Sequence, residues 1–451
     1  MANSVSQRDS FSGKYGFIAA AAGSAIGLGN IWKFPYITGV YGGSAFIIVY
    51  LICILLIGLP VMLSEISVGR RAQKGVFGAY KTLAPGTPWF FSGYMGIAAA
   101  FLILSFYGVV AGWTMEYVIK ALAGSFTGKN PDQIGAMFEN FIGQTARPIL
   151  WQVGFMALTC FIVIAGIKNG IEKYSKILMP ILLVILLMLC LRSVTLDGAS
   201  KGFEFLFKPD FSKLSGEAIL AAMGHAFFSL SLGMGTLVTY GSYLKKTEPL
   251  APLAGQITVA DTFIALLAGI AIFPAVFAFG IEPSAGPGLV FVTLPNVFAQ
   301  MPLGNIFCIL FFSLLAIAAL TSSISILEVV VAHLVEDFKV SRKTATLMMT
   351  LVITLFGIPS SLSFGSLSDL SIFGLNFFDL ADHIASNFLL PLGGLCISLF
   401  VGWKMARKDV ADELSNSGAV KIAYLPVFLF LTRIVAPIAI ATVFLHGLNM
   451  I

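Results

Sequence analysis

Eleven stretches of the chain are long and apolar enough to cross a membrane, and this feature constrains the fold most. A transmembrane helix needs about 20 predominantly apolar residues. Hydrophobic residues make up 58% of the 451 residues and charged residues only 11%, against about 25% charged in soluble domains. An all-α polytopic membrane protein is predicted, with spans near 15–37, 43–69, 90–123, 150–167, 175–195, 217–243, 253–280, 305–336, 344–360, 376–403 and 422–447.

Composition and motif content exclude several other classes of protein. The net charge of +5 comes from short clusters between the apolar blocks, without a basic aromatic groove, so a nucleic-acid binder is excluded. All five cysteines lie in apolar blocks without metal-ligand spacing and are interpreted as small buried residues. The four histidines lie far apart, with no nucleophile, metal or paired-aspartate motif beside them, so an enzyme is not expected. No obligate protein partner is expected.

The lysines and arginines predict how the chain is oriented in the membrane. Eighteen of the 27 fall in segments on the side of the N-terminus and seven on the opposite side, with Lys33 and Arg433 inside spans. The excess of positive charge on cytoplasmic loops places the N-terminus inside and, with eleven spans, the C-terminus outside. The apolar stretch 283–305 is interrupted by prolines and glycines, and we expect it to fold back onto the outer mouth.

Two of the expected spans carry glycines and small polar residues at their middle. The first contains GSAIGLGN at 23–30, and the sixth contains SLSLGMG at 229–235. Unwinding in lipid leaves backbone groups without partners, at a cost of several kcal/mol each. Close helix packing through small residues explains either segment alone. Two interrupted helices five spans apart instead indicate an inverted-repeat transporter, with repeats near 15–195 and 217–403 and an extra helix near 422–447.

Four motifs in these spans carry a family resemblance. They are GSAIGLGNIWKFP at 23–35, GLP at 58–60 followed by Glu65 and Arg70, FFSLSLGMG at 227–235, and LTSS at 320–323. In this order and at these spans they resemble the neurotransmitter:sodium symporter family. The resemblance implies one transporter domain over 1–451, with the 5+5 inverted-repeat fold and helices 1 and 6 unwound at mid-membrane. The sequence resembles most the short bacterial members of the family, which have eleven helices. This resemblance implies that the protein lies in a bacterial cell membrane.

The resemblance implies two sodium sites and no organic cofactor. Sodium is a hard cation that suits carbonyl, hydroxyl and carboxylate oxygens. A Thr-Ser pair such as Thr321-Ser322 also commonly bonds back to preceding carbonyls of its own helix, which is the alternative interpretation. The family pattern gives Ala25, Asn30, Ser229, Asp261 and the substrate carboxylate for the first site, and Gly23, Ile26, Ala318, Thr321 and Ser322 for the second.

Two departures from the family pattern bear on what is transported. Amine-carrying relatives have an aspartate at the position of Gly27, so here the substrate is expected to bring its own carboxylate, as an amino acid does. Asp261 stands where many relatives have asparagine, and chloride-dependent members have a glutamine and a serine at the positions of His225 and Ala265. A carboxylate beside the sodium can replace chloride in charge balance, which predicts chloride independence. The alternative is that Asp261 is a structural cap facing the cytoplasm.

The resemblance also implies a pocket for an amino acid between the interrupted helices. Tyr107 is expected to donate its hydroxyl to the substrate carboxylate; the alternative is an interfacial aromatic residue. Met234, between two glycines, suits several side-chain shapes, although one methionine in a helix is usually core. No residue of the set is charged, which favours an aliphatic or aromatic substrate side chain. The set is Ala25, Gly27, Leu28, Gly29, Ile103, Tyr107, Phe228, Ser229, Ser231, Met234, Ser322 and Ile326.

Charged residues inside spans are expected to be functional. Arg8 and Glu336 match the inner-gate pair of the family, with Phe11 and Tyr243 beside them. Glu65 matches the glutamate that holds unwound backbone amides of helix six. The chain is thus expected to be a sodium-coupled symporter that imports hydrophobic L-amino acids by alternating access.

The outer gate and span five complete the expectations. Lys33 replaces the usual outer-gate arginine, the aspartate that usually opposes it aligns with Ser371, and Asp369 is expected to substitute. In span five, Gly170 and Pro180 are expected to let the cytoplasmic end unwind and admit water to the second sodium site. An ordinary proline kink is the alternative.

Overall fold

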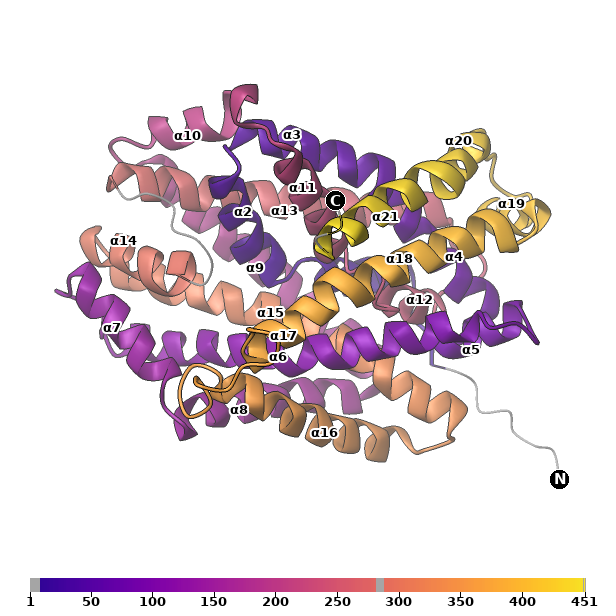
Figure 1. The fold of residues 1–451 in the computed structure, drawn as a ribbon, viewed down its shortest axis with the longest axis horizontal. Coiled ribbons are helices and arrows are strands. Elements are labelled where there is room, and N and C mark those ends of the chain that lie inside the picture. The colour runs from indigo at the N-terminus through magenta and orange to yellow at the C-terminus, as the bar shows by residue number, and fades with distance from the viewer. Residues whose placement is uncertain (1–8, 281–287, 449, 451) are drawn as a thin grey trace.

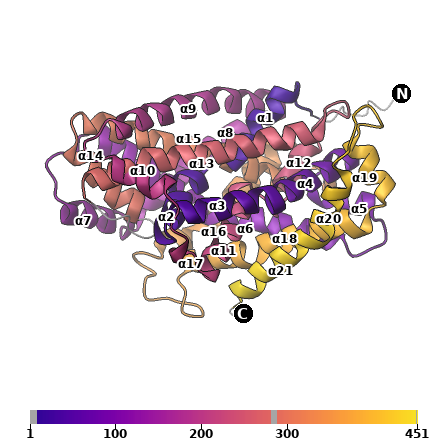
Figure 2. The same ribbon diagram turned by 90° about the horizontal axis from the view of Figure 1, so that it is seen from above.

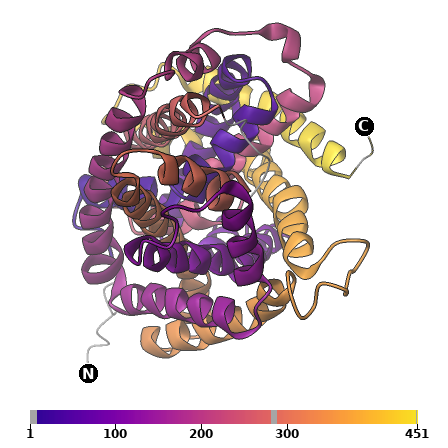
Figure 3. The same ribbon diagram turned by 90° about the vertical axis from the view of Figure 1, so that its left-hand side faces the viewer.

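Backbone N–H and C=O groups inside a bilayer need partners within the protein, and a helix provides them within one segment. The computed structural model describes residues 9–280, 288–448 and 450, and every regular element in these ranges is a helix. The helices lie mostly along one long axis (Figure 1). Seen along that axis they fill a rounded cross-section (Figure 3). The predicted all-α membrane fold is confirmed.

Nine helical segments of the described residues are each long and apolar enough to span a membrane. Several contain a π-helical turn (η), which leaves the segment continuous. The segments are α3–η2–α4 (Ser44–Cys53, Ile54–Gly58, Leu59–Ala72), α6 (Phe90–Leu122), α8 (Ala146–Ile164), η3–α9 (Ile167–Glu172, Lys173–Val194), α13 (Leu250–Ala278), α15 (Gly304–Asp337), α16 (Arg342–Leu362), α17–η6–α18–η7 (Phe377–His383, Ile384–Leu389, Leu390–Leu399, Phe400–Lys404) and α20–η8–α21 (Leu425–Phe430, Leu431–Val435, Ala436–Gly447).

The two predicted breaks are present. Helix α1 (Lys14–Ala25) ends before Gly27, and after a bend of 47° the chain continues as η1 (Gly29–Lys33) and α2 (Phe34–Val40). Helix α11 (Gly216–Ser229) is separated from α12 (Thr236–Gly241) by the non-helical residues 230–235. By length and composition, the nine continuous segments and the bent pair of span one give ten of the eleven predicted spans among the described residues. The predicted sixth span corresponds to α11 and α12, which are each shorter than a full span.

Short helices lie at the two ends of the long axis. Helices α5 and α19 lie at one end, and α7, α10 and α14 lie at the other (Figures 1 and 2). The first end carries Arg70, Arg71 and Lys81, in keeping with the charge asymmetry of the sequence. The bounds are α5 (Val76–Leu83), α7 (Pro131–Ile142), α10 (Ser200–Phe207), η4 (Phe211–Lys213), η5 (Leu289–Thr293), α14 (Leu294–Gln300) and α19 (Arg407–Leu414).

Two connections between spans, at residues 168–174 and 283–305, contain helices. The approximate predicted spans leave residues 168–174 between them, and the structure makes these residues helical: a turn at Gly166, whose φ is 88°, leads directly into η3, so Lys168 and Lys173 lie in a helix. Glycine adopts this left-handed conformation without a steric penalty, and no apolar pattern marks so short a connection. The described part of the stretch 283–305 contains the apolar helix Leu289–Gln300, which is too short to span and packs against α15. Residues 283–287 lie outside the described residues.

A buried ion pair fixes α19 against the end of α4. Arg70 Nε lies 2.5 Å from Glu413 Oε1, and the two side chains are only 1% and 3% exposed. Arg70 also donates to the backbone carbonyls of Glu248 and Glu413. These contacts join the second span, the loop before α13 and the connection between the last two spans. Removing one partner of such a pair leaves an uncompensated buried charge.

Replacing Glu413 with glutamine should therefore lower the free energy of unfolding by about 3 kcal/mol. The matched control is Glu204→Gln, because the Glu204–Lys208 pair on α10 is 60% and 75% exposed and an exposed pair contributes little to stability. Thermal unfolding of both variants in detergent measures the difference. Equal stabilities for the two variants would contradict the buried-pair argument.

Candidate substrate and sodium sites

The two breaks meet at the middle of the bundle. Ser231, in the non-helical residues of the sixth span, donates its hydroxyl to the carbonyl of Ser24 at 2.9 Å. Ser322 of α15 donates to the same carbonyl at 3.0 Å. Ser231 adopts a positive φ of 55°, which turns its side chain toward α1. Three helices from both halves of the chain thus converge where α1 loses its own hydrogen-bond ladder.

Glu65 supports the second break as the resemblance implied. Its Oε1 accepts a hydrogen bond from the backbone amide of Gly233 at 2.7 Å, and the side chain is buried. Gly233 has a φ of 82°, and a Cβ there would lie 2.2 Å from the carbonyl oxygen of Leu390. Glycine is therefore required sterically, and the carboxylate replaces the helical partner that its amide lacks.

Asn30, Ser229, Asp261 and Tyr50 form the first oxygen cluster, which is fully buried. Asn30 Nδ2 donates to Asp261 Oδ1 at 2.7 Å, and Ser229 Oγ donates to Asp261 Oδ2 at 2.9 Å. The Tyr50 hydroxyl lies 3.3 Å from Ser229 Oγ. Asp261 thus lies in the bundle interior, which excludes the alternative of a cap facing the cytoplasm. Ala25 is the last residue of α1, and the last carbonyls of a helix have no partner farther along the same helix.

Gly23, Ala318, Thr321 and Ser322 form the second oxygen cluster. Thr321 donates to the carbonyls of Ala318 at 3.0 Å and Ile317 at 3.2 Å, so its back-bonding interpretation holds in this conformation. Ser322 instead reaches across to the Gly23 carbonyl at 3.4 Å. A Cβ on Gly23 would lie 3.2 Å from Thr321 Cβ, which shows how closely α1 and α15 approach. Ile26 follows as the C-cap of α1.

The implied substrate residues surround one small cavity beside these clusters. Eleven of the twelve line it; Ser229 belongs to the adjoining first cluster, and Ser24 is an additional lining residue. The Tyr107 hydroxyl accepts a hydrogen bond from the Leu28 amide at 3.2 Å, so it points at the break and not at a membrane interface. A Cβ on Gly27 would lie 2.4 Å from Ser322 Oγ and 3.0 Å from the Tyr107 hydroxyl. Any side chain at position 27 would therefore displace these groups.

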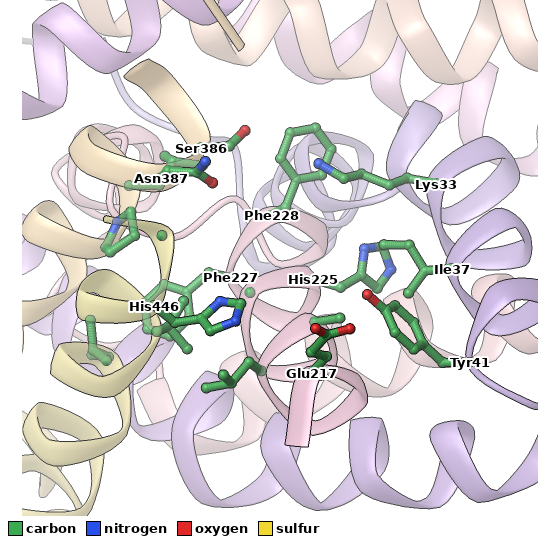
Figure 4. A pocket seen from close by; sticks show the side chains of 18 residues that line it. Lys33, Ile37, Tyr41, Glu217, His225, Phe227, Phe228, Ser386, Asn387 and His446 are labelled. Carbon is green, nitrogen blue, oxygen red and sulfur yellow. The ribbon is translucent and has the colours of Figure 1, made fainter. Parts of the chain in front are cut away.

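A second, outer pocket lies on the other side of Phe228. Phe228 lines both cavities, so its ring separates them. Lys33 Nζ lies 4.3 Å from the centre of the same ring (Figure 4). Glu217, Ser386 and Asn387 also line the outer pocket. The proposed partner Asp369 lies in an exposed loop, and within the described ranges no ion pair joins it to Lys33.

The structure describes three of the four residues expected at the inner gate. Arg8 lies outside the described residues, but Phe11 and Tyr243 are in contact: the Phe11 amide donates to the Tyr243 carbonyl at 3.3 Å, and their ring centres are 6.3 Å apart. Glu336 accepts a hydrogen bond from the Gly75 amide at 2.7 Å. Gly170 lies in η3, and a Cβ there would be 2.1 Å from the Ile162 carbonyl oxygen.

Sequence reasoning left several polar contacts unassigned. Glu328 is fully buried and joins the Tyr243 hydroxyl at 2.7 Å to the Arg342 guanidinium at 2.5 Å. Tyr50 was not expected in the first cluster. A polar side chain within an apolar span, Glu328 or Tyr50, was the only sequence signal of these contacts. The sequence does not show their partners, because these come from other helices. Arg433 donates to the Gly402 carbonyl at 2.5 Å.

Comparison with known proteins agrees with this geometry. The model of the sodium:neurotransmitter symporter family matches residues 8–135 and 136–451. The chain belongs to this family. It is 44% identical to the sodium-dependent transporter YhdH of Bacillus subtilis, over 97% of each chain, and 36% identical to a sodium-dependent transporter of Haemophilus influenzae, over 99% of this chain and 100% of that one.

A solved structure is similar over nearly the whole symporter. The crystal structure of MhsT in complex with L-phenylalanine has 49% sequence identity and a TM-score of 0.91, covering 98% of this chain and 100% of that one. Membership shows that the protein is a sodium-coupled membrane transporter and not an enzyme. The symporter fold with two interrupted helices is likewise confirmed.

Sodium should stabilise the symporter in part through the first oxygen cluster. A ligand that binds only the folded state adds RT ln(1 + [L]/Kd), about 2.7 kcal/mol at 100 times the dissociation constant. We expect sodium chloride to raise the Tm above its value in potassium chloride at equal ionic strength. Asp261→Ala should reduce this increment to the part that comes from the second oxygen cluster, whereas Asp369→Ala, in an exposed loop, should keep it in full. An undiminished sodium increment in Asp261→Ala would contradict the assignment.

Proposed function

We propose that the symporter imports hydrophobic L-amino acids, both aliphatic and aromatic, together with sodium and independently of chloride. The observation that carries the proposal is the lining of the inner cavity. Ile103, Phe228, Met234 and Ile326 supply its apolar part, and none of its lining residues is charged. A charged substrate side chain would lack a partner in this buried space, whereas an apolar one gains from it. The complex of MhsT with L-phenylalanine supports the same class of substrate.

The polar edge of the cavity supports a carboxylate at one end of the substrate. The Leu28 amide and the Tyr107 hydroxyl are 3.2 Å apart at the break in span one. An N-terminal helix end with free amides favours an anion, and Tyr107 can redirect its hydroxyl to the same oxygen. Gly27 leaves no room for a protein carboxylate here. The substrate therefore supplies the charge, which also completes the first sodium site.

Chloride independence follows from Asp261. Its carboxylate already lies with Asn30, Ser229 and Tyr50 in the first cluster. The positions that bind chloride in dependent relatives hold His225 and Ala265, both buried. The His225 ring packs on Phe34 and Tyr50 at 5.8 and 5.3 Å. A resident carboxylate supplies the negative charge that chloride would otherwise bring.

The transport cycle follows from differential binding to two states. Two sodium ions and the amino acid stabilise a state closed above Phe228, and loss of the second sodium lets the inner side open past Phe11 and Glu336. The membrane potential contributes about 2.3 kcal/mol per charge per 100 mV. We place the protein in the cell membrane of a bacterium, with α5 and α19 on the cytoplasmic side and the end of α21 outside. No organic cofactor or protein partner enters this cycle.

Uptake into proteoliposomes tests the proposal directly. Labelled leucine or tryptophan is offered with sodium chloride, sodium gluconate or potassium chloride outside. Accumulation should occur in both sodium salts and fail in potassium. Accumulation in sodium chloride alone would overturn chloride independence, and no uptake of either amino acid would overturn the substrate class in favour of an amino-acid sensor or a different cargo.

Gly27→Ala should reduce amino-acid uptake at least about tenfold, because its Cβ would push into Ser322 and Tyr107. Gly255→Ala is the matched control, since a Cβ at that helical position meets nothing within 4 Å. Initial rates at saturating sodium, normalised to folded protein, measure both variants. Normal uptake by Gly27→Ala would contradict the placement of the substrate.

A further inference from the structure

Helix α1 begins without any of the usual groups that cap a helix. Its N-cap residue is Gly13, no side chain of its own segment accepts a hydrogen bond there, and no acidic residue lies in its first turn. A helix N-terminus leaves up to four amides without helical partners and carries partial positive charge. An acceptor from elsewhere in the fold is therefore expected at this end.

Glu172 of span five places a carboxylate beside this end and bonds Ser12, the residue that precedes the N-cap. Its Oε2 accepts a hydrogen bond from the Ser12 amide at 2.8 Å, and its Oε1 accepts one from the Ser12 hydroxyl. Lys176, one helical turn later, pairs with the same carboxylate. The side chain of Glu172 is buried against α1, and the bare surface of Gly16 makes room for it: a Cβ on Gly16 would lie 2.3 Å from Oε1.

The segment that Glu172 holds is also tied to the other half of the transporter. Phe11, next to Ser12, is 1% exposed, and its amide donates to the Tyr243 carbonyl at 3.3 Å. Its ring lies 5.6 Å from the rings of both Phe17 and Tyr240. Residues 11 and 12 are thus clamped between the end of the sixth span and the start of the fifth.

Glu172 lies at the least regular part of span five. It is the last residue of the π-helical turn η3, and Pro180 interrupts the hydrogen-bond ladder of α9 two turns later. Between them, Met179 lies against Gly23 of the second oxygen cluster: a Cβ on Gly23 would lie 3.3 Å from its sulfur. Helix α1 packs along α9 and η3 throughout this region (Figure 2). The segment from Glu172 to Pro180 therefore separates that cluster from the outside of the bundle.

We propose that Glu172 is a positioning residue of the transport cycle, which latches the N-terminal segment to span five through Ser12. While the latch is closed, Met179 stays over the second oxygen cluster. Release of Ser12 and movement of Met179 are then one coupled event, so the inner gate and the sodium exit open together. This inference rests on the proposed sodium-coupled function and specifies which side chain links two of its moving parts.

A cysteine at position 179 reports on the latch. Met179→Cys is treated in inside-out vesicles with a membrane-impermeant thiol reagent, and the protein without this cysteine gives the background rate. In sodium, Glu172→Gln should raise the modification rate about tenfold, the factor expected for loss of one charge-assisted hydrogen bond. Glu204→Gln, which alters an exposed pair on α10, should leave the rate within about twofold of the parent. A rate for Glu172→Gln within twofold of the parent overturns the proposal.

Gly16→Ala tests the same contact without altering any charge. Its methyl group should displace the Glu172 carboxylate and reproduce the faster modification, although alanine favours a helix. In a Glu172→Ala background the methyl group meets no carboxylate, so Gly16→Ala should add nothing further. Equal increases with and without Glu172 would show that the two residues act independently and would contradict the latch. Gly255→Ala is the control for the added methyl group.

Two measurements separate the latch from the proposed function and from misfolding. The reporter needs no transported amino acid, so a faster rate in Glu172→Gln supports the latch even if leucine and tryptophan are not substrates. Size-exclusion profiles and the Tm identify folded variants, and Ser12→Ala offers a milder change that keeps the backbone amide. An unchanged rate in folded Ser12→Ala and Glu172→Gln together would refute the proposal.

Discussion

The structure depends on one constraint: a backbone polar group inside a bilayer must find a partner within the protein. Nine segments meet it with continuous helices, and spans one and six meet it differently. At their breaks the missing helical partners are replaced by side chains of other spans. Glu65 holds the Gly233 amide, and Ser231 and Ser322 hold the Ser24 carbonyl. The remaining terminal carbonyls of α1 are available to a cation.

The breaks also explain why the site lies where the two halves of the chain meet. Each half contributes one interrupted helix, and a substrate between them contacts both. Asp261 and Asn30 place a carboxylate and an amide on one side, and Tyr107 and Ser322 lie on the other. On the proposed assignment, a small change at one break alters ligands of both sodium sites and of the substrate, and this is the physical basis that we propose for their coupling.

The spans and their two breaks were predictable from the sequence, because the sequence features that indicate them are local. Lipid-spanning length and the glycines of 23–30 and 229–235 each reside in one segment. The family resemblance also selected residues of which eleven line one cavity, and that an amino acid binds there stays a prediction. Contacts between distant segments were not predictable: nothing near Glu328 points to Arg342, and nothing near Glu172 points to Ser12. The predicted span near 175–195 begins later than the helix, because the helix starts with polar residues such as Lys168, Asn169 and Glu172 directly after the turn at Gly166.

The central claim is that the two breaks together hold sodium and an amino acid. An experimental structure of the symporter, determined with sodium and L-leucine, tests it most directly. The account predicts leucine in the cavity below Phe228, with its carboxylate at the break in α1, one ion in the first oxygen cluster and one in the second. Leucine bound only in the outer pocket beside Lys33, or clusters without ions at saturating sodium, would contradict it.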